Sequence, residues 1–358
     1  MDVALDNIIF ALQTHGGISV YWAELLRRAS KDGAKWLDPA HALLNLSRAS
    51  LHDIAIRGKN TIFPSQVDRY RPVDSNATIV HSSYYRIPKL TKTRLITTVY
   101  DFTYEKYRHG PALWLHHAQK MAAIKRSEVV LCISNSTAMD LIKFCGKDYS
   151  RKIEVTHLAV SPNFRRIPNA KDALVTKHSW LAETLQSKRL LLFVGSRINY
   201  KRFDLAVKSC ANYADSHLVA IGGGAIMPTE KKFIQECDLE NRISFIPLAS
   251  SEELAQWYSI SHALLYLSDY EGFGLPVLEA SQCGCPVLAQ INSSIPEVHG
   301  FHDILVTSPD PKGNLNEILK SLENEKIRGK AISSMSAHAD TFTWDKCWEL
   351  TSNIYRSI

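Results

Sequence analysis

Residues 190–206, LLLFVGSRINYKRFDLA, combine three features that decide the fold class. The apolar run 190–195 is typical of a buried strand, and Arg197 and Lys201 follow it in one loop. An amphipathic pattern then begins near Phe203. Residues 164–188, just upstream, contain no strand signal, so we expect a new α/β domain to open at Leu190.

Short apolar runs and amphipathic segments alternate along the rest of the chain as well. The expected strands are 7–12, 77–82, 94–100, 128–133, 152–157, 190–195, 218–223, 243–247, 262–267, 286–289 and 304–306. The expected helices between them include 21–29, 112–126, 203–213, 252–258 and 314–322. Apolar strands alternating with helices indicate parallel sheets covered on both faces. We therefore predict an α/β fold of two doubly wound, Rossmann-like domains facing across a cleft.

The length of 358 residues also favours two domains over one. We place the first domain at residues 1–170 and the second at 171–340. Residues 341–358 read as a final helix with Thr343 as its N-cap, and we expect this helix to pack back on the first domain.

Composition excludes several classes of protein. The net charge of +6 is mild and the basic residues are scattered, which argues against nucleic acid as a partner. The seven cysteines include no CxxC pair, so we expect reduced, packed thiols and no zinc site. Residues 1–17 lack a signal-peptide pattern, and no run approaches the roughly 18 apolar residues of a membrane span. We expect a cytoplasmic protein that can lie on the inner face of a membrane without crossing it.

Candidate ligand-binding loops follow the predicted strands, where doubly wound sheets bind ligands. Gly16 and Gly17 lie between a predicted strand and a helix, and they form either a phosphate or sugar contact or a plain tight turn. Arg197 and Lys201, after Gly195, suit a diphosphate, although a solvated basic loop is an equal alternative. The run Gly222 to Met227 lacks the third glycine of a dinucleotide fingerprint, which argues against a dehydrogenase.

The stretch SDYEGFGLPVLEA, residues 268–280, contains two acids that need different explanations. Pro276 predicts a helix from about Leu275 to Cys283, which places Glu279 in the first turn, where the helix dipole stabilises a carboxylate. Glu271 precedes a glycine-containing loop with exposed amides. Because carboxylates accept hydrogen bonds from sugar hydroxyls, a functional role for Glu271 is favoured over a structural one.

These motifs together resemble the retaining glycosyltransferases of family four, which have the GT-B fold. The resemblance rests on EGFGLPVLEA with VGSRINYKRF, SEELAQWYSISHALLYLS, GCPVLA and SSIPEV, and it is strongest from Leu190 to Val298. The variant GSRxxYK further resembles bacterial polysaccharide and O-antigen mannosyltransferases.

The resemblance implies a role for each matching residue. Glu279 would bind the ribose of a nucleotide-sugar donor, Glu271 the donor sugar, and Arg197 with Lys201 the diphosphate. Neither a metal nor another cofactor is implied, since the nucleotide sugar is a substrate. Seven further positions would contribute to donor binding through the backbone, by its amides or by its close approach to the donor. They are Gly16, Gly17, Gly195, Gly272, Phe273, Gly274 and Leu275.

Two departures from the family pattern affect these assignments. Tyr100-Asp101 stands where the family commonly has His-Asp, so Tyr100, His81 or Asp101 would supply the sugar contact, and we retain Asp101 as the catalytic candidate. Arg197 also stands two residues after Gly195 rather than one.

The expected activity is transfer of a hexose, with retention, to a glycan or lipid-linked acceptor in surface polysaccharide and lipopolysaccharide synthesis. Mannose from GDP-mannose is the preferred donor. The alternatives are a UDP-sugar donor, a nucleotide-sugar epimerase and a non-catalytic glycan-assembly component. For the basic segment RIPKLTKTR, residues 86–94, a solvated loop is favoured over contact with an anionic membrane.

Overall fold

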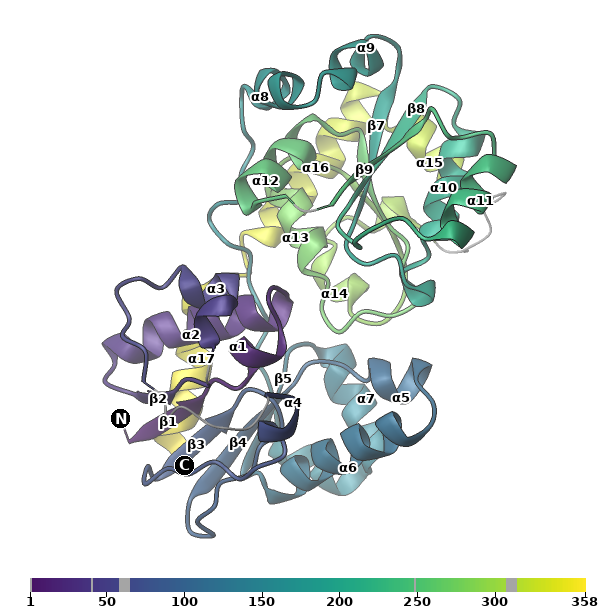
Figure 1. Cartoon of the computed structure of the whole chain (residues 1–358). Helices are drawn as coiled ribbons and strands as arrows, with labels where there is room; N and C mark the ends of the chain where they lie inside the picture. The colour runs from purple at the N-terminus through teal and green to yellow at the C-terminus, as the bar shows by residue number, and fades with distance from the viewer. Residues whose placement is uncertain (1, 40, 58–64, 248, 307–313) are drawn as a thin grey trace. The chain divides into compact units, whose positions relative to one another are not determined.

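The computed structural model describes residues 2–39, 41–57, 65–247, 249–306 and 314–358. The chain forms two compact units (Figure 1). Unit 1 comprises Met1–Leu158 together with Thr343–Ile358, and unit 2 comprises Ala159–Phe342.

Unit 1 is built on a six-stranded parallel sheet in the order β2-β1-β3-β4-β5-β6. Its strands are β1 (Val3–Asp6), β2 (Lys35–Leu37), β3 (Ile79–Ser82), β4 (Arg94–Val99), β5 (Val129–Cys132) and β6 (Ile153–Val155). The order reverses between β1 and β3, which is the switch point of a doubly wound sheet. The strands β1 and β3 are buried along their whole length, as expected for a sheet covered on both faces.

Helices flank this sheet and connect its strands. They are α1 (Ile9–Leu12), α2 (Gly17–Lys31), α3 (Leu46–Ala49), α4 (Ser65–Asp68), α5 (Thr103–Tyr107), α6 (Pro111–Arg126), α7 (Asn135–Cys145) and α17 (Trp344–Ser357), with the 3₁₀ turns η1 (Ala42–Leu44) and η2 (Lys147–Lys152). The final helix, α17, lies beside α2 in unit 1 (Figure 1). Thr343 caps it by accepting a hydrogen bond from Lys346 N–H, as predicted. Asp345 forms an ion pair with Arg28 of α2.

The prediction of a strand at 7–12 is wrong. The first strand lies upstream at Val3–Asp6, and Ile9–Leu12 form the short helix α1. Residues Ile8, Ile9 and Phe10 are all buried, and a short run of buried apolar residues does not distinguish a strand from a helical turn. A backbone bond from Phe10 N–H to the carbonyl of Asn7 begins the turn.

Unit 2 contains a second six-stranded parallel sheet, in the order β12-β11-β10-β7-β8-β9. Its strands are β7 (Arg189–Val194), β8 (Ser216–Ile221), β9 (Ile243–Ile246), β10 (Ala263–Tyr266), β11 (Val287–Gln290) and β12 (Leu305–Val306). Each of the six expected strands of this region is present. The order reverses between β7 and β10, so the switch point of unit 2 lies at the carboxyl ends of these two strands.

The helices of unit 2 follow the same alternation. They are α8 (Ala170–Lys177), α9 (Trp180–Ser187), α10 (Phe203–Asn212), α11 (Pro228–Glu236), α12 (Ser251–Ile260), α13 (Leu275–Gln282), α14 (Ile295–Val298), α15 (Leu315–Ser321) and α16 (Glu325–Ala339), with η3 (Asn199–Lys201) and η4 (His302–Ile304). The segment before α8 already contacts this unit, because Ile167 N–H donates to Ser259 and Phe164 packs against Tyr258.

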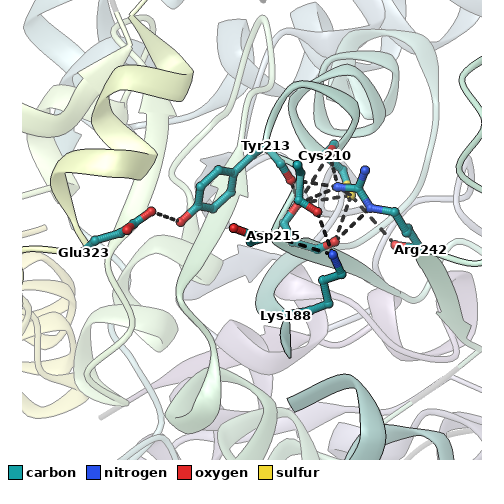
Figure 2. A network of polar contacts seen from close by, with 8 residues as sticks. Lys188, Cys210, Tyr213, Asp215, Arg242 and Glu323 are labelled. Atoms are coloured by element: carbon teal, nitrogen blue, oxygen red, sulfur yellow. Dashed lines mark hydrogen bonds and ion pairs between the residues drawn. The ribbon is translucent and has the colours of Figure 1, made fainter. Parts of the chain in front are cut away.

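A network of polar contacts connects the segments at the amino ends of strands in the unit 2 sheet (Figure 2). The guanidinium of Arg242 donates to the backbone carbonyls of Cys210 and Tyr213 at the end of α10, where helix carbonyls lack intrahelical partners. The Tyr213 hydroxyl donates to Glu323 over 2.6 Å. This network lies before β7, β8 and β9, at the opposite end of the sheet from the switch point, and we assign it to stability.

Candidate functional site

The loops after β7 and β10 meet at the switch point of unit 2. Asp269 N–H, after β10, donates to the carbonyl of Tyr200, after β7, over 2.7 Å. Arg202 reaches across to the Asp269 carboxylate at 3.2 Å. Doubly wound sheets bind ligands at this place, and both loops contain residues that the sequence predicts to bind a ligand.

Lys201 and Glu271 form the central pair of this site. Lys201 Nζ lies 2.5 Å from Glu271 Oε1, and both side chains are mostly buried. The Lys201 ammonium also lies near the rings of Tyr200 and Tyr266, which favours a cation. Burial and the adjacent Glu271 carboxylate raise the pKa of Tyr266 well above its usual value. The site thus contains one cation, which can bind an anionic group, and one carboxylate, which can accept hydrogen bonds from hydroxyl groups.

The loop 271–274 is held in place by two serines that precede α14. Ser293 Oγ accepts a hydrogen bond from Glu271 N–H, and Ser294 Oγ donates to the carbonyls of Glu271 and Phe273. Gly274 has φ of +104°, and a Cβ there would come within 3.3 Å of Ile295. These contacts explain why SSIPEV accompanies EGFGLP. Sequence reasoning missed the serines as site residues, although the motif contained them.

The four backbone positions proposed after Glu271 differ in side-chain placement. Phe273 is buried against Phe342, so it can offer only its backbone to a ligand. Leu275 begins α13, directly after Gly274, and Gly272 is half-buried. The first turn of a helix leaves N–H groups without intrahelical partners, and α13 presents this turn at the carboxyl end of β10.

Glu279 lies in the second turn of α13, and the prediction of a first-turn capping acid is wrong. The helix begins at Leu275, which places Glu279 beyond the reach of the free N–H groups of the helix start. Its nearest polar partner is the Tyr258 hydroxyl of α12, at 3.3 Å. Burial raises the pKa of Glu279 to about 7. Glu279 therefore does not act as a helix cap.

Arg197 has a different set of partners from the Lys201–Glu271 pair. The Arg197 side chain is only 2% exposed, and its Nε forms an ion pair with Glu230 at 2.9 Å. It also donates to the backbone carbonyls of Gly222, Gly224 and Ala225 in the loop after β8. The structure therefore does not bring Arg197 and Lys201 together as two free cations for one diphosphate. Arg197 is also the residue that departs from the family spacing, since it stands two residues after Gly195 rather than one.

The glycines around Arg197 pack closely. Gly195, at the end of β7, has φ of +114°, and its carbonyl lies 3.1 Å from the position of a Cβ on Gly223. The same Cβ would lie 2.7 Å from Arg197 Nη1. Of the three glycines after β8, Gly223 thus allows close packing against Arg197.

Gly16 and Gly17 do not follow a strand directly, because α1 intervenes between β1 and α2. Gly17 is the first residue of α2, and the carbonyl of Gly16 accepts hydrogen bonds from Val20 N–H and the Ser19 hydroxyl. A Cβ on Gly16 would lie 2.8 Å from Gln13 Oε1. The exposed start of a 15-residue helix remains suited to an anionic or hydroxylated ligand.

Of the three candidates for the role of the family histidine, two belong to the core of unit 1. Tyr100 is buried, accepts a hydrogen bond from Trp22 Nε1 and donates to the carbonyl of Ser83. His81 is fully buried between Tyr355 and Thr98, and burial lowers its pKa to about 3. Asp101 is half-buried at the carboxyl end of β4 and accepts a hydrogen bond from Thr103 N–H. Of the three, only Asp101 is partly exposed.

The basic segment 86–94 is not one continuous patch. Arg86 pairs with the buried Asp6 at 2.9 Å, and this pair occupies the switch point between β1 and β3. Burial raises the pKa of Asp6, with Arg86 opposing that shift. Lys89 and Lys92 are exposed, and Arg94 starts β4, at the edge of the sheet opposite Asp101.

Two kinds of feature are absent from the described residues. No group of three or more His, Cys, Asp or Glu side chains there is arranged to hold a metal ion. No helix in the same ranges combines the length and apolarity needed to cross a membrane.

Part of the chain resembles a known family of enzymes. Residues 180–336 match the family model described as glycosyl transferases group 1. O-antigen chain mannosyltransferase B of Escherichia coli is 35% identical over 119 residues, which are 33% of this chain and 31% of that protein. O-antigen chain mannosyltransferase RfbU of Salmonella typhimurium is 24% identical over 287 residues, 78% of this chain and 73% of that protein.

A likeness in structure extends over the whole chain. The Anabaena protein HepE, solved in complex with UDP and glucose, superposes with a TM-score of 0.76 at 14% identity and covers 99% of both chains. At that identity the likeness establishes the fold. Residues 180–336 thus match the glycosyl transferases of group 1, and the two six-stranded parallel sheets, with this likeness over both chains, give the chain the GT-B fold.

Proposed function

We propose that this protein is a retaining glycosyltransferase that moves a hexose from a nucleotide diphosphate sugar to a glycan or lipid-linked acceptor. The single observation that supports this most is the Lys201–Glu271 pair, because it places one cation and one carboxylate at the switch point of the donor-type sheet. An ammonium suits a diphosphate, and a carboxylate suits sugar hydroxyls. Glu279, in the second turn of α13, would bind the ribose.

Lys201 would stabilise the departing diphosphate, assisted by the positive start of α13. The bond between the anomeric carbon and the phosphate oxygen breaks, while the acceptor hydroxyl forms the new bond to the same face of that carbon. Its proton passes to the departing phosphate oxygen. Glu271 binds the sugar and is given no role as a nucleophile. Asp101 is the candidate sugar contact from unit 1.

GDP-mannose is the proposed donor and mannose the transferred sugar, in keeping with the mannosyltransferase relatives. A UDP-sugar is the second candidate, since HepE was solved with UDP and glucose. Thermal-shift titration with GDP, UDP, GDP-mannose and UDP-glucose should show stabilisation by one nucleotide family. We expect the GDP pair to stabilise the protein more, and preference for the UDP pair would overturn the donor assignment.

Transfer itself is tested with the preferred donor and a panel of glycan and lipid-linked acceptors. NMR of the product should show the anomeric configuration of the donor, and an inverted product would overturn the retaining assignment. The proposal needs no metal, so activity should persist in EDTA. Incubation with donor alone should leave the sugar unepimerised, and a new epimer would favour the epimerase alternative.

A further inference from the structure

The Arg197 guanidinium organises the loop that follows β8. Its Nη1 donates to Gly222 O over 2.7 Å, and its Nη2 donates to Gly224 O over 3.1 Å and to Ala225 O over 2.9 Å. The remaining Nε donates to Glu230 Oε1 over 2.9 Å. One side chain from the β7 loop therefore bonds to three carbonyls of the next loop.

Glu230 extends this arrangement to the start of α11. Its second oxygen, Oε2, accepts a hydrogen bond from Met227 N–H over 2.8 Å. Arg197 thus fixes the loop at both ends, at Gly222 directly and at Met227 through Glu230. Phe203 and Phe245 lie beside the guanidinium and shield it from water.

The bonded carbonyls determine where the N–H groups of the same loop point. In a trans peptide unit the C=O and N–H bonds point in opposite directions, and the described residues contain no cis peptide. When the carbonyls of Gly222, Gly224 and Ala225 turn toward Arg197, the N–H groups of Gly223, Ala225 and Ile226 turn away from it. These three residues are exposed, and within the described ranges their N–H groups donate to no protein acceptor.

We propose that Arg197 is a positioning residue for a backbone donor site at 223–226, which binds acceptor oxygens of the nucleotide, and that it is not itself a diphosphate ligand. This inference rests on the proposed function, because the ligand is the donor nucleotide. The loop lies at the carboxyl end of β8, next to β7, on the side of the sheet where ligands are expected. The backbone N–H groups of residues 223–226 would thus bind the nucleotide, a task that the sequence suggests for the charge of Arg197.

Hydrogen–deuterium exchange of the wild-type protein tests the site directly, using saturating GDP and, separately, UDP. A peptide that covers residues 222–227 should exchange more slowly when the preferred nucleotide is bound. Unchanged exchange in 222–227, with protection in 195–201 or 271–275, would overturn this inference alone. Absence of protection throughout unit 2 would overturn the proposed function as well.

Arg197→Lys tests the role of Arg197 in that site. Lysine keeps the positive charge but cannot bond three carbonyls and Glu230 at once. We expect nucleoside diphosphate affinity to fall at least about tenfold and the nucleotide-dependent protection of 222–227 to be lost. Near wild-type affinity would show that charge alone suffices and would overturn the inference.

Glu230→Gln provides a milder variant in case Arg197→Lys does not fold. It keeps the shape of the side chain and weakens the hold of Arg197 on Met227. We expect a smaller loss of affinity together with faster exchange of 222–227 in the free protein. Unchanged exchange and unchanged affinity in this variant would also count against the inference.

Discussion

Lys201 Nζ and Glu271 Oε1 lie 2.5 Å apart, although their residues belong to loops separated by 70 positions in sequence. Contacts within the surrounding loops hold this mostly buried pair, namely those of Ser293 and Ser294 and the bond from Asp269 N–H to the Tyr200 carbonyl. A donor diphosphate would compete with Glu271 for Lys201, and a donor sugar would compete with Lys201 for Glu271. The pair therefore links the two halves of donor binding, and each half can be altered separately.

Lys201→Ala should lower turnover about 10²–10³-fold, the usual effect of removing one charge-stabilising group from a transition state. The measurement is the initial rate of sugar transfer at saturating donor. Lys232→Ala is the matched control, because Lys232 lies exposed on α11 and pairs only loosely with Glu236. Turnover of Lys201→Ala within a few-fold of the control would contradict the leaving-group role.

Glu271→Gln should change binding and turnover in opposite directions. Without the carboxylate, Lys201 is free for the diphosphate, so nucleoside diphosphate affinity should rise about fivefold, corresponding to about 1 kcal/mol for a partly exposed ion pair. Sugar transfer should fall, because the amide of the variant accepts hydrogen bonds from the donor sugar's hydroxyls more weakly than the Glu271 carboxylate does. Calorimetry and initial rates measure the two effects. A loss of nucleoside diphosphate affinity would show that Glu271 does not compete for Lys201.

The strands of unit 2 could be predicted because buried parallel strands leave local, nearly continuous apolar runs. The start of α13 was also predictable, since Pro276 marks the first turn. The strand β2 was missed because three residues, KWL, are too few to show a pattern. The α1 helix was mistaken for a strand because its burial hides the helical period.

The partners of the site residues could not be read from local sequence. Arg197 bonds to carbonyls 25 to 28 positions away, and nothing in GSRINYK indicates this. Glu279 meets Tyr258 from a different helix. The order of the strands in the sheet decides which loops become neighbours, because β7 lies between β10 and β8. Local sequence does not contain this order.

Tyr100→Phe tests the departure from the family histidine. The change removes the acceptor for Trp22 Nε1 and the donor to Ser83 O in a buried site. We expect a loss of about 1–3 kcal/mol in the free energy of unfolding, with transfer activity of the folded protein within a few-fold of wild type. Urea denaturation and initial rates measure the two quantities. A large loss of activity without loss of stability would return Tyr100 to the site.

Arg48→Met tests a fully buried ion pair in unit 1. Arg48 and Asp38 are both 0% exposed in their side chains and pair at 2.9 Å. Removing only the cation leaves a buried, uncompensated carboxylate, so we expect the free energy of unfolding to fall by about 3–5 kcal/mol. The double variant Asp38→Asn, Arg48→Met should recover part of that loss in urea denaturation. A single variant as stable as wild type would show that the pair contributes no net stability.

Glu279→Gln tests the raised pKa of this carboxyl group, which burial moves from 4.5 to about 7. A raised pKa means that the folded state keeps a proton that the unfolded state has already lost between these two pH values. The stabilisation from the protonated group is complete below pH 4.5 and is lost as the pH rises to about 7. The advantage of the uncharged variant over wild type should therefore be near zero at pH 4.5. It should reach at most about 3 kcal/mol at pH 8.

Urea denaturation of both proteins at pH 5 and pH 8 measures this difference, and an equal difference at the two values would show that Glu279 titrates normally. The same titration should control binding, because an ionised carboxylate accepts two ribose hydrogen bonds better than a protonated one. Nucleoside diphosphate affinity of the wild type should thus rise between pH 6 and pH 8. Since the terminal phosphate also titrates in this range, Glu279→Gln is measured in parallel. Equal pH dependence in the two proteins would assign the effect to the phosphate and remove Glu279 from the ribose site.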